Sequence, residues 1–260
     1  MLALSGAAAA TRRKEAVNRF HVPVRMDVRT AMTNPAWNQW FKLNLRCSQR
    51  TFELVSCTLY HLASSGGYRE TAAALGVSKA WCVKAVNQML RVLCRLSTEY
   101  VTMPTQSEEW DEIEEGFRSV NGFPWCAGAV DGTLVEIQWP HNCDGWYNRK
   151  GRPSFNVQAV CDHRKKFLAF DVRLGDSGYA LLPVLMTPFP DDGELSRERK
   201  MYNYIHSSPR MKIEGAFGLL KERFRVFKIA LPAKTISGAV RTVIACMVLH
   251  NIMIDLEDDG

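Results

Sequence analysis

The stretch Ala127-Gly-Ala-Val-Asp-Gly-Thr-Leu-Val-Glu-Ile-Gln-Trp139 decides the fold of this chain. Apolar and polar residues alternate along it well enough for a β-strand, and Gly132 lets another segment approach Asp131 closely. Two more stretches with strand character follow, Ser154–Asp162 and Phe167–Arg173. The sequence therefore predicts a meander of three strands.

Helical patterns flank the meander. Downstream, Ser207 or Ser208 is suited to cap a helix whose first turn contains Pro209, and a last apolar helix is expected from about 236 to 256. Upstream, apolar residues recur at helical spacing from Thr51 onward, with breaks at Gly66-Gly67 and Gly76. This order of elements indicates an α+β fold.

The string Tyr68-Arg-Glu-Thr-Ala-Ala-Ala-Leu-Gly-Val-Ser-Lys-Ala-Trp-Cys-Val83 is typical of a helix-turn-helix. In that motif the start of the last helix enters the major groove of DNA. The alternative is a plain helical hairpin that caps the next domain, because small helical bundles show the same periodicity; we favour DNA binding. The side chains expected at the DNA are Ser78, Lys79, Trp81 and Lys84, with Arg69 and Arg91 as phosphate contacts.

The composition fits a folded protein and sets few limits on function. Hydrophobic residues make up 47% of the 260 residues and aromatic residues 10%, which argues against disorder. The formal charge of +6 permits nucleic-acid binding without showing it. The eight cysteines include no C-x-x-C pair, so a reducing intracellular compartment is the simplest expectation. No apolar run looks long enough to span a bilayer, so no membrane partner is expected.

Three acidic residues, Asp131, Asp176 and Glu214, stand in apolar settings where a charge is costly unless it is compensated. Their settings are Ala-Val-Asp-Gly-Thr, Leu-Gly-Asp-Ser-Gly-Tyr and Lys-Ile-Glu-Gly-Ala-Phe. Converging carboxylates are usually compensated by a divalent metal, and their oxygens suit Mg²⁺ or Mn²⁺. The pattern therefore indicates a metal-dependent nuclease or strand-transfer domain.

Together these segments resemble the PIF/Harbinger transposases and the nucleases derived from Harbinger transposases, a branch of the DDE endonuclease superfamily. The resemblance covers roughly residues 50–255 and includes the helix-turn-helix. Its strings are Ala129-Val-Asp-Gly-Thr133, Tyr147-Asn-Arg-Lys-Gly151, Ser154–Asp162, Leu174-Gly-Asp-Ser-Gly-Tyr-Ala-Leu-Leu-Pro183, Met186-Thr-Pro188 and Tyr202–Phe224.

The resemblance implies an RNase H-like mixed sheet in which Asp131, Asp176 and Glu214 hold two divalent ions, Mg²⁺ or Mn²⁺. One ion would activate water or a 3′-hydroxyl, and the other would stabilise the leaving oxygen of a DNA phosphodiester bond. The resemblance also implies a nuclear protein, with the cytoplasm as the alternative, and a Myb-like partner that aids DNA recognition. Further candidate DNA contacts are Arg149, Lys150, Arg210, Lys212, Lys221, Arg223 and Arg225.

The chain departs from the family pattern just before the Gly-Asp-Ser-Gly-Tyr motif. Family members carry a turn and a helix there, whereas Phe170–Arg173 runs directly into Leu174-Gly-Asp176. A fourth strand parallel to the first needs a crossover of about a dozen residues or more, and none is available. If 168–176 forms one strand, Asp176 lies about 9.5 Å laterally from Asp131, whereas paired metal ions lie ~3.5–4 Å apart. Loss of the covering helix would also expose apolar strand surface and favour self-association into oligomers.

The predicted organisation of the chain has four parts. The parts are an N-terminal tail at 1–45, a helix-turn-helix-like DNA-binding region at 46–104, a linker helix at 105–126, and an RNase H-like nuclease domain at 127–260 that lacks a crossover near 173–174.

Three functions are compatible with this organisation. The first function is a divalent-metal-dependent DNA endonuclease or transposase that uses the Asp-Asp-Glu triad. The second is a catalytically inactive DNA-binding protein derived from a transposase, and the third is a truncated product that folds only in part. The three acids favour the first function, and the missing crossover favours the other two.

Overall fold

The computed structural model describes residues 30–31, 34–138, 147–148, 150–174, 186–190, 193, 195–232 and 235–257. The chain forms two compact units, Met1–Phe52 and Glu53–Gly260. In the first unit, the helices η1 (Pro35–Trp37) and α3 (Asn38–Asn44) lie within the segment 1–45 that was expected to be a tail. Phe41 is buried there and its ring contacts those of Trp40 and Phe52. The predicted domain boundaries stay predictions.

The upstream helices form where their patterns predict them. They are α4 (Gln49–Ala63), α5 (Gly67–Leu75), α6 (Lys79–Arg95), α7 (Ser97–Tyr100) and α8 (Ser107–Asn121). Gly76 ends α5 in the left-handed conformation at φ 69°, which a residue with a Cβ adopts at a cost. Ser78 then caps α6 by accepting a hydrogen bond from the Trp81 N–H at 3.2 Å. The two helices and the turn between them lie where the sequence predicts them, and the DNA-binding role of this segment stays a prediction.

The predicted meander is confirmed as a three-stranded antiparallel sheet in the order β1-β2-β3. Its strands are β1 (Ala129–Glu136), β2 (Ser154–Cys161) and β3 (Phe167–Leu174). The pairing register places Asp131 opposite Ala159, and Ala159 opposite Phe170. Beyond β1, Ile137 forms a parallel bridge with Leu231. The architecture is α+β, as the sequence indicated.

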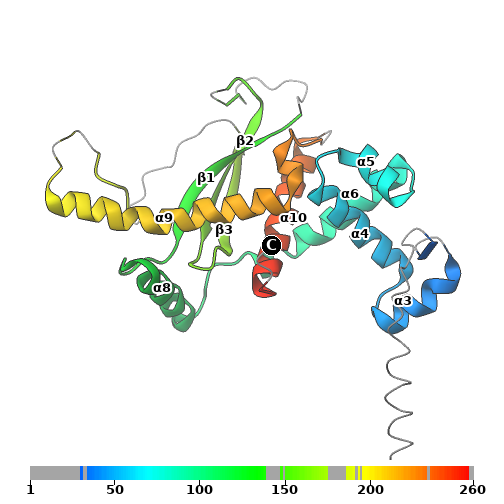
Figure 1. Cartoon of the computed structure of the whole chain (residues 1–260), viewed down its shortest axis with the longest axis horizontal. Helices are drawn as coiled ribbons and strands as arrows, with labels where there is room; N and C mark the ends of the chain where they lie inside the picture. Colours follow the sequence, from blue (N-terminus) through cyan, green and yellow to red (C-terminus); the bar gives the residue numbers. More distant parts are fainter. Residues whose placement is uncertain are drawn as a thin grey trace, which may run out of the picture. The chain divides into compact units, whose positions relative to one another are not determined.

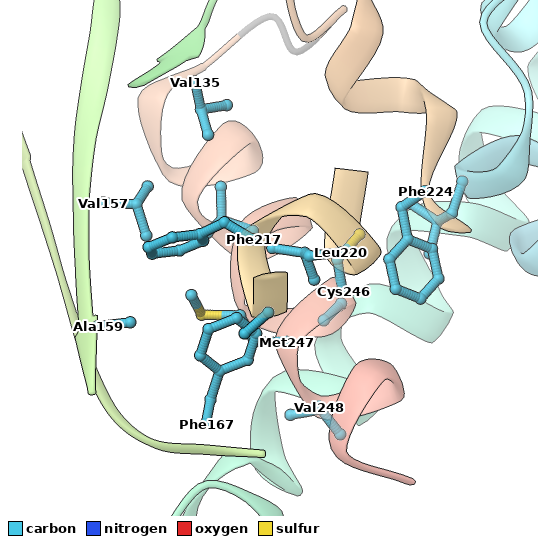
Figure 2. Packing of buried hydrophobic residues seen from close by; sticks show 14 of the residues in the cluster. Val135, Val157, Ala159, Phe167, Phe217, Leu220, Phe224, Cys246, Met247 and Val248 are labelled. Atoms are coloured by element: carbon cyan, nitrogen blue, oxygen red, sulfur yellow. The ribbon is translucent and has the colours of Figure 1, made fainter. Parts of the chain in front are cut away.

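Two long helices cover one face of this sheet (Figure 1). α9 (Arg197–Arg223) packs mainly on β1, and α10 (Ile236–Asp255) packs on β3, α6 and α7; the short η2 (Arg225–Lys228) lies between them in sequence. Figure 2 shows Val135 and Val157 of the strands facing Phe217 of α9 and Met247 of α10. Because α10 contacts both α6 and the sheet, one continuous core runs from α4 to α10 among the described residues.

α9 begins earlier than the sequence predicts. The expected N-cap at Ser207 or Ser208 is wrong, because Ser196 caps the helix and Pro209 lies buried inside it. The extra turns carry no clear apolar stripe, so their stability comes from tertiary contacts. Asn203 binds both the N–H and the carbonyl of Phe189, at 2.8 and 2.9 Å. The rings of Tyr202 and Phe189 also meet edge to face.

α10 joins the sheet to the helical region through its last two turns. His250 is buried and donates from Nε2 to the Lys165 carbonyl at 2.9 Å. Asn251 is also fully buried and binds the Phe167 N–H, the Phe167 carbonyl and the Tyr100 carbonyl. By length and composition alone α10 could cross a membrane, so the expectation that no apolar run is long enough to span a bilayer was wrong. Half of its most apolar window is buried against the rest of the protein, which accounts for that composition.

Candidate functional site

Asp131 is the third residue of β1 and lies on the sheet face that α9 covers. Alternation along a strand places Asp131 on the same face as Thr133. Thr133 is tied to α9, because its hydroxyl accepts a hydrogen bond from Lys221 Nζ at 2.6 Å. The Asp131 carboxylate is half-buried and accepts the Gly132 N–H at 2.8 Å. The first predicted acid therefore points toward the helix that carries the last one.

Glu214 lies on α9 about two helical turns before Lys221, so the two side chains leave the helix on the same side. The Glu214 side chain is 52% exposed and forms an ion pair with Arg210, with Nε and Oε1 3.1 Å apart. Such an exposed pair is worth only about 0–1 kcal/mol, so another cation can replace the guanidinium at low cost.

A cavity of about 430 Å³ joins these elements. Asp131 and Arg210 both line it, so the first acid and the ion-pair partner of the last acid face the same space. Its wall is completed by Phe123, residues 125–130, residues 186–188, His206 and Pro209. His206 fixes the Met186 segment there by donating from Nε2 to the Met186 carbonyl at 2.9 Å.

Two of the three predicted metal ligands, Asp131 and Glu214, lie among the residues that the structure describes. Asp176 lies outside the described residues, and within the described ranges no group of three His, Cys, Asp or Glu side chains could hold a metal ion. Asp131 and Glu214 supply hard carboxylate oxygens, which suit Mg²⁺ or Mn²⁺.

The register of the sheet limits how the third ligand can join them. Leu174 ends β3 two residues before Asp176 and stands in the same cross-strand row as Phe155 and Val135. Two strand spacings and four residues along the strand separate its Cα from that of Asp131, which amounts to about 16 Å. Asp176 can share an ion with Asp131 only if the chain turns back over the sheet directly after Leu174.

A second cavity, of about 1000 Å³, lies beside α6. All four cations predicted as contacts of the helix-turn-helix line it: Lys79, Lys84, Arg69 and Arg91. Residues from the start of α10 and the preceding segment form the opposite wall, including Leu231, Pro232, Thr235, Gly238 and Thr242. No Asp or Glu is among its lining residues, all of which are described. We call this cavity the basic cleft.

Two predicted DNA contacts near the basic cleft have other roles. Trp81 is only partly exposed and packs against the hydrophobic core, because it follows the buried side of α6. The Ser78 hydroxyl is used in capping α6. The polar side chains that α6 presents in the cleft instead are Asn87 and Gln88, which sequence reasoning missed.

The other predicted basic contacts differ in environment. Lys150 is exposed in a turn that Asn148 organises, since the Asn148 carboxamide oxygen accepts the N–H groups of Lys150 and Arg152. Arg149 lies outside the described residues. Lys212 is half-buried on α9. Lys221 is not available to phosphate, because its ammonium binds Thr133 and the Leu134 carbonyl, and burial lowers its pKa.

The sequence is similar to one known protein family and to several known proteins. Residues 167–251, which include β3, α9 and most of α10, match the family described as "DDE superfamily endonuclease". The human protein named "Putative nuclease HARBI1" is 26% identical over 215 residues, covering 70% of this chain and 61% of the relative. "Protein ALP1-like" of Arabidopsis thaliana is 27% identical over 194 residues, covering 57% and 48%. No solved structure shows significant similarity to the chain.

Over residues 167–251, about a third of the chain, the sequence is therefore similar to the DDE superfamily of endonucleases. The similarity to a protein named as a putative nuclease agrees with the resemblance to Harbinger-derived nucleases that the sequence indicated. The chain spans about 61% of the length of its human relative.

The same alignment bears on the missing crossover. It runs over 215 positions but covers 70% of 260 residues, about 182, so about 33 positions of the relative have no counterpart here. This difference agrees with an internal segment that the relative has and this chain lacks.

Proposed function

We propose that this chain is a divalent-metal-dependent DNA endonuclease that uses Asp131, Asp176 and Glu214. One observation carries the proposal: the cavity lined by Asp131 is also lined by Arg210, the residue that holds Glu214. Asp131 and the ion-pair partner of Glu214 thus line one cavity, although Asp131 and Glu214 are 83 positions apart in sequence.

The described residues have separable roles in such an enzyme. Divalent ions held by the carboxylates would activate water for attack on a phosphodiester bond and stabilise the leaving oxygen. If Glu214 held a metal ion in place of its ion pair, the Arg210 guanidinium would be free to face the cavity. There it can bind the DNA phosphate, because a guanidinium matches two phosphate oxygens.

The basic cleft is the proposed holding site for the DNA backbone. Its four cations and the absence of acids from its lining favour a polyanion, and Asn87 and Gln88 are side chains that can read base edges. From the resemblance to the Harbinger-derived nucleases, we also propose that the protein works in the nucleus, with a Myb-like partner that aids DNA recognition.

A second candidate is a DNA-binding protein without catalysis. Two observations favour this second candidate. The chain lacks about 33 positions that its human relative has, and the Cα atoms of Leu174 and Asp131 are about 16 Å apart. In this case the basic cleft keeps its function while Asp176 fails to reach the other two acids.

Titration of Mn²⁺ into the purified chain by calorimetry separates the candidates. The endonuclease predicts specific binding that Asp131→Ala abolishes. The matched control is Glu222→Ala, an exposed acid on the same helix that is paired with Lys228. Arg210→Ala should tighten binding by about twofold to fivefold, because the metal no longer competes with an exposed ion pair.

Each result assigns the function. Mn²⁺ binding lost in Asp131→Ala, with Mn²⁺-dependent cleavage of DNA by the parent protein, supports the endonuclease. DNA binding with no specific Mn²⁺ site supports the second candidate. Equal Mn²⁺ binding by the parent and Asp131→Ala contradicts the proposed site.

A further inference from the structure

Trp125 is the most exposed large hydrophobic side chain among the described residues, at 83% of its surface. Its backbone has φ 54°, a left-handed conformation that is costly for a residue with a bulky side chain. A carboxylate oxygen of Glu114 accepts its N–H at 3.2 Å, and its neighbours Phe123 and Cys126 are buried. The protein therefore fixes this loop in a strained shape that directs an indole into solvent.

The indole stands at the candidate active site. Trp125 lines the same cavity as Asp131 and Arg210, and Phe123, Pro209 and Met186 supply its other apolar walls. The volume of about 430 Å³ lies in the range of cavities that take small planar ligands. An exposed aromatic face beside a carboxylate and a guanidinium suits a ligand with a flat ring attached to a phosphate.

A nucleotide whose base is unstacked has this chemistry. In continuous duplex each base face is covered by its neighbours, so an indole can stack only on an unpaired or extruded base. We infer that Trp125 stacks on an unpaired base beside the phosphate to be cut, so that the site prefers DNA with an unpaired nucleotide over continuous duplex. This inference rests on the proposed endonuclease and specifies the form of its DNA.

The test uses the full chain and two matched DNA duplexes without divalent metal. One duplex carries a single unpaired 2-aminopurine, and the other carries the same base paired. We expect tighter binding of the bulged duplex and quenching of its 2-aminopurine fluorescence on binding. Trp125→Ala should weaken that binding by on the order of 5- to 100-fold, remove the quenching and leave paired-duplex binding unchanged.

Two further variants control for folding and for surface effects. Trp125→Gly also removes the indole, but it suits φ 54°, so its melting temperature should equal or exceed that of the parent. Tyr204→Ala removes an aromatic ring that is 76% exposed on α9 outside the cavity, and should bind both duplexes like the parent.

The outcomes separate this inference from the proposed function. If the parent protein binds both duplexes equally, or if Trp125→Ala keeps the preference and the quenching, the role of Trp125 is wrong while DNA binding stands. If the parent binds neither duplex, the DNA-directed function fails and this inference fails with it.

Discussion

The salt dependence of DNA binding tests the basic cleft quantitatively. Lys79 and Lys84 stand at the start of α6 and both line the cleft, so Lys79→Ala/Lys84→Ala removes half of its four cations. Both side chains are exposed, so the double variant should fold like the parent. The perturbation therefore changes charge in the cleft with little effect on stability.

The expected size follows from counterion release. If all four cations contact phosphates, log K falls against log salt with a slope of about −3.6, and between 50 and 200 mM salt the parent loses about 150-fold in affinity. With two cations left the slope is about −1.8, and the loss over the same range is about 12-fold.

Fluorescence anisotropy with a labelled duplex at four or five salt concentrations measures both slopes. Arg197→Ala/Lys200→Ala is the matched control, because it removes the same charge from exposed positions on α9 outside the cleft. Its slope should equal that of the parent. A Lys79/Lys84 variant with the parental slope would refute the reasoning, since it would place the phosphate contacts elsewhere.

Three further predictions concern the packing that supports both sites. Burial lowers the pKa of His61 and His250 to about 4 from 6.5, so the unfolded chain protonates first as pH falls. The unfolding free energy should therefore drop by roughly 2–3 kcal/mol between pH 7.5 and 5.5, measured by urea melts at both values; an unchanged midpoint would contradict it. Asn251→Leu leaves three buried backbone groups without their partner and should cost about 3–5 kcal/mol, seen as a lower melting temperature. Lys221→Met should cost about 1–2 kcal/mol through its lost bonds to Thr133 and Leu134 while DNA affinity stays within about twofold, because its ammonium holds α9 to β1 instead of phosphate. A large loss of affinity with unchanged stability would reverse that assignment.

Much of the fold follows from local sequence. The alternation in β1, β2 and β3 gave three strands with bounds close to those observed. Gly76 and Ser78 placed the turn and the cap before α6, because a left-handed residue and an N-cap hydroxyl act within a few residues. The candidate site was predictable to the extent that short strings marked it: Asp131, Glu214 and the four cations of the basic cleft.

The sequence by itself determined the elements, the chemistry of the candidate ligands and the resemblance to a family. Only the tertiary structure decided which charges face a shared space. It showed that Arg210, the ion-pair partner of Glu214, lines the same cavity as Asp131. It also showed that Lys221 binds Thr133 of β1 and that Trp125 is exposed on a strained loop. It also extended α9 through Pro209, because Asn203 and Tyr202 bind the segment around Phe189. The physical reason is common to these cases: each depends on contacts between residues far apart in the chain, and local propensity carries no information about such contacts.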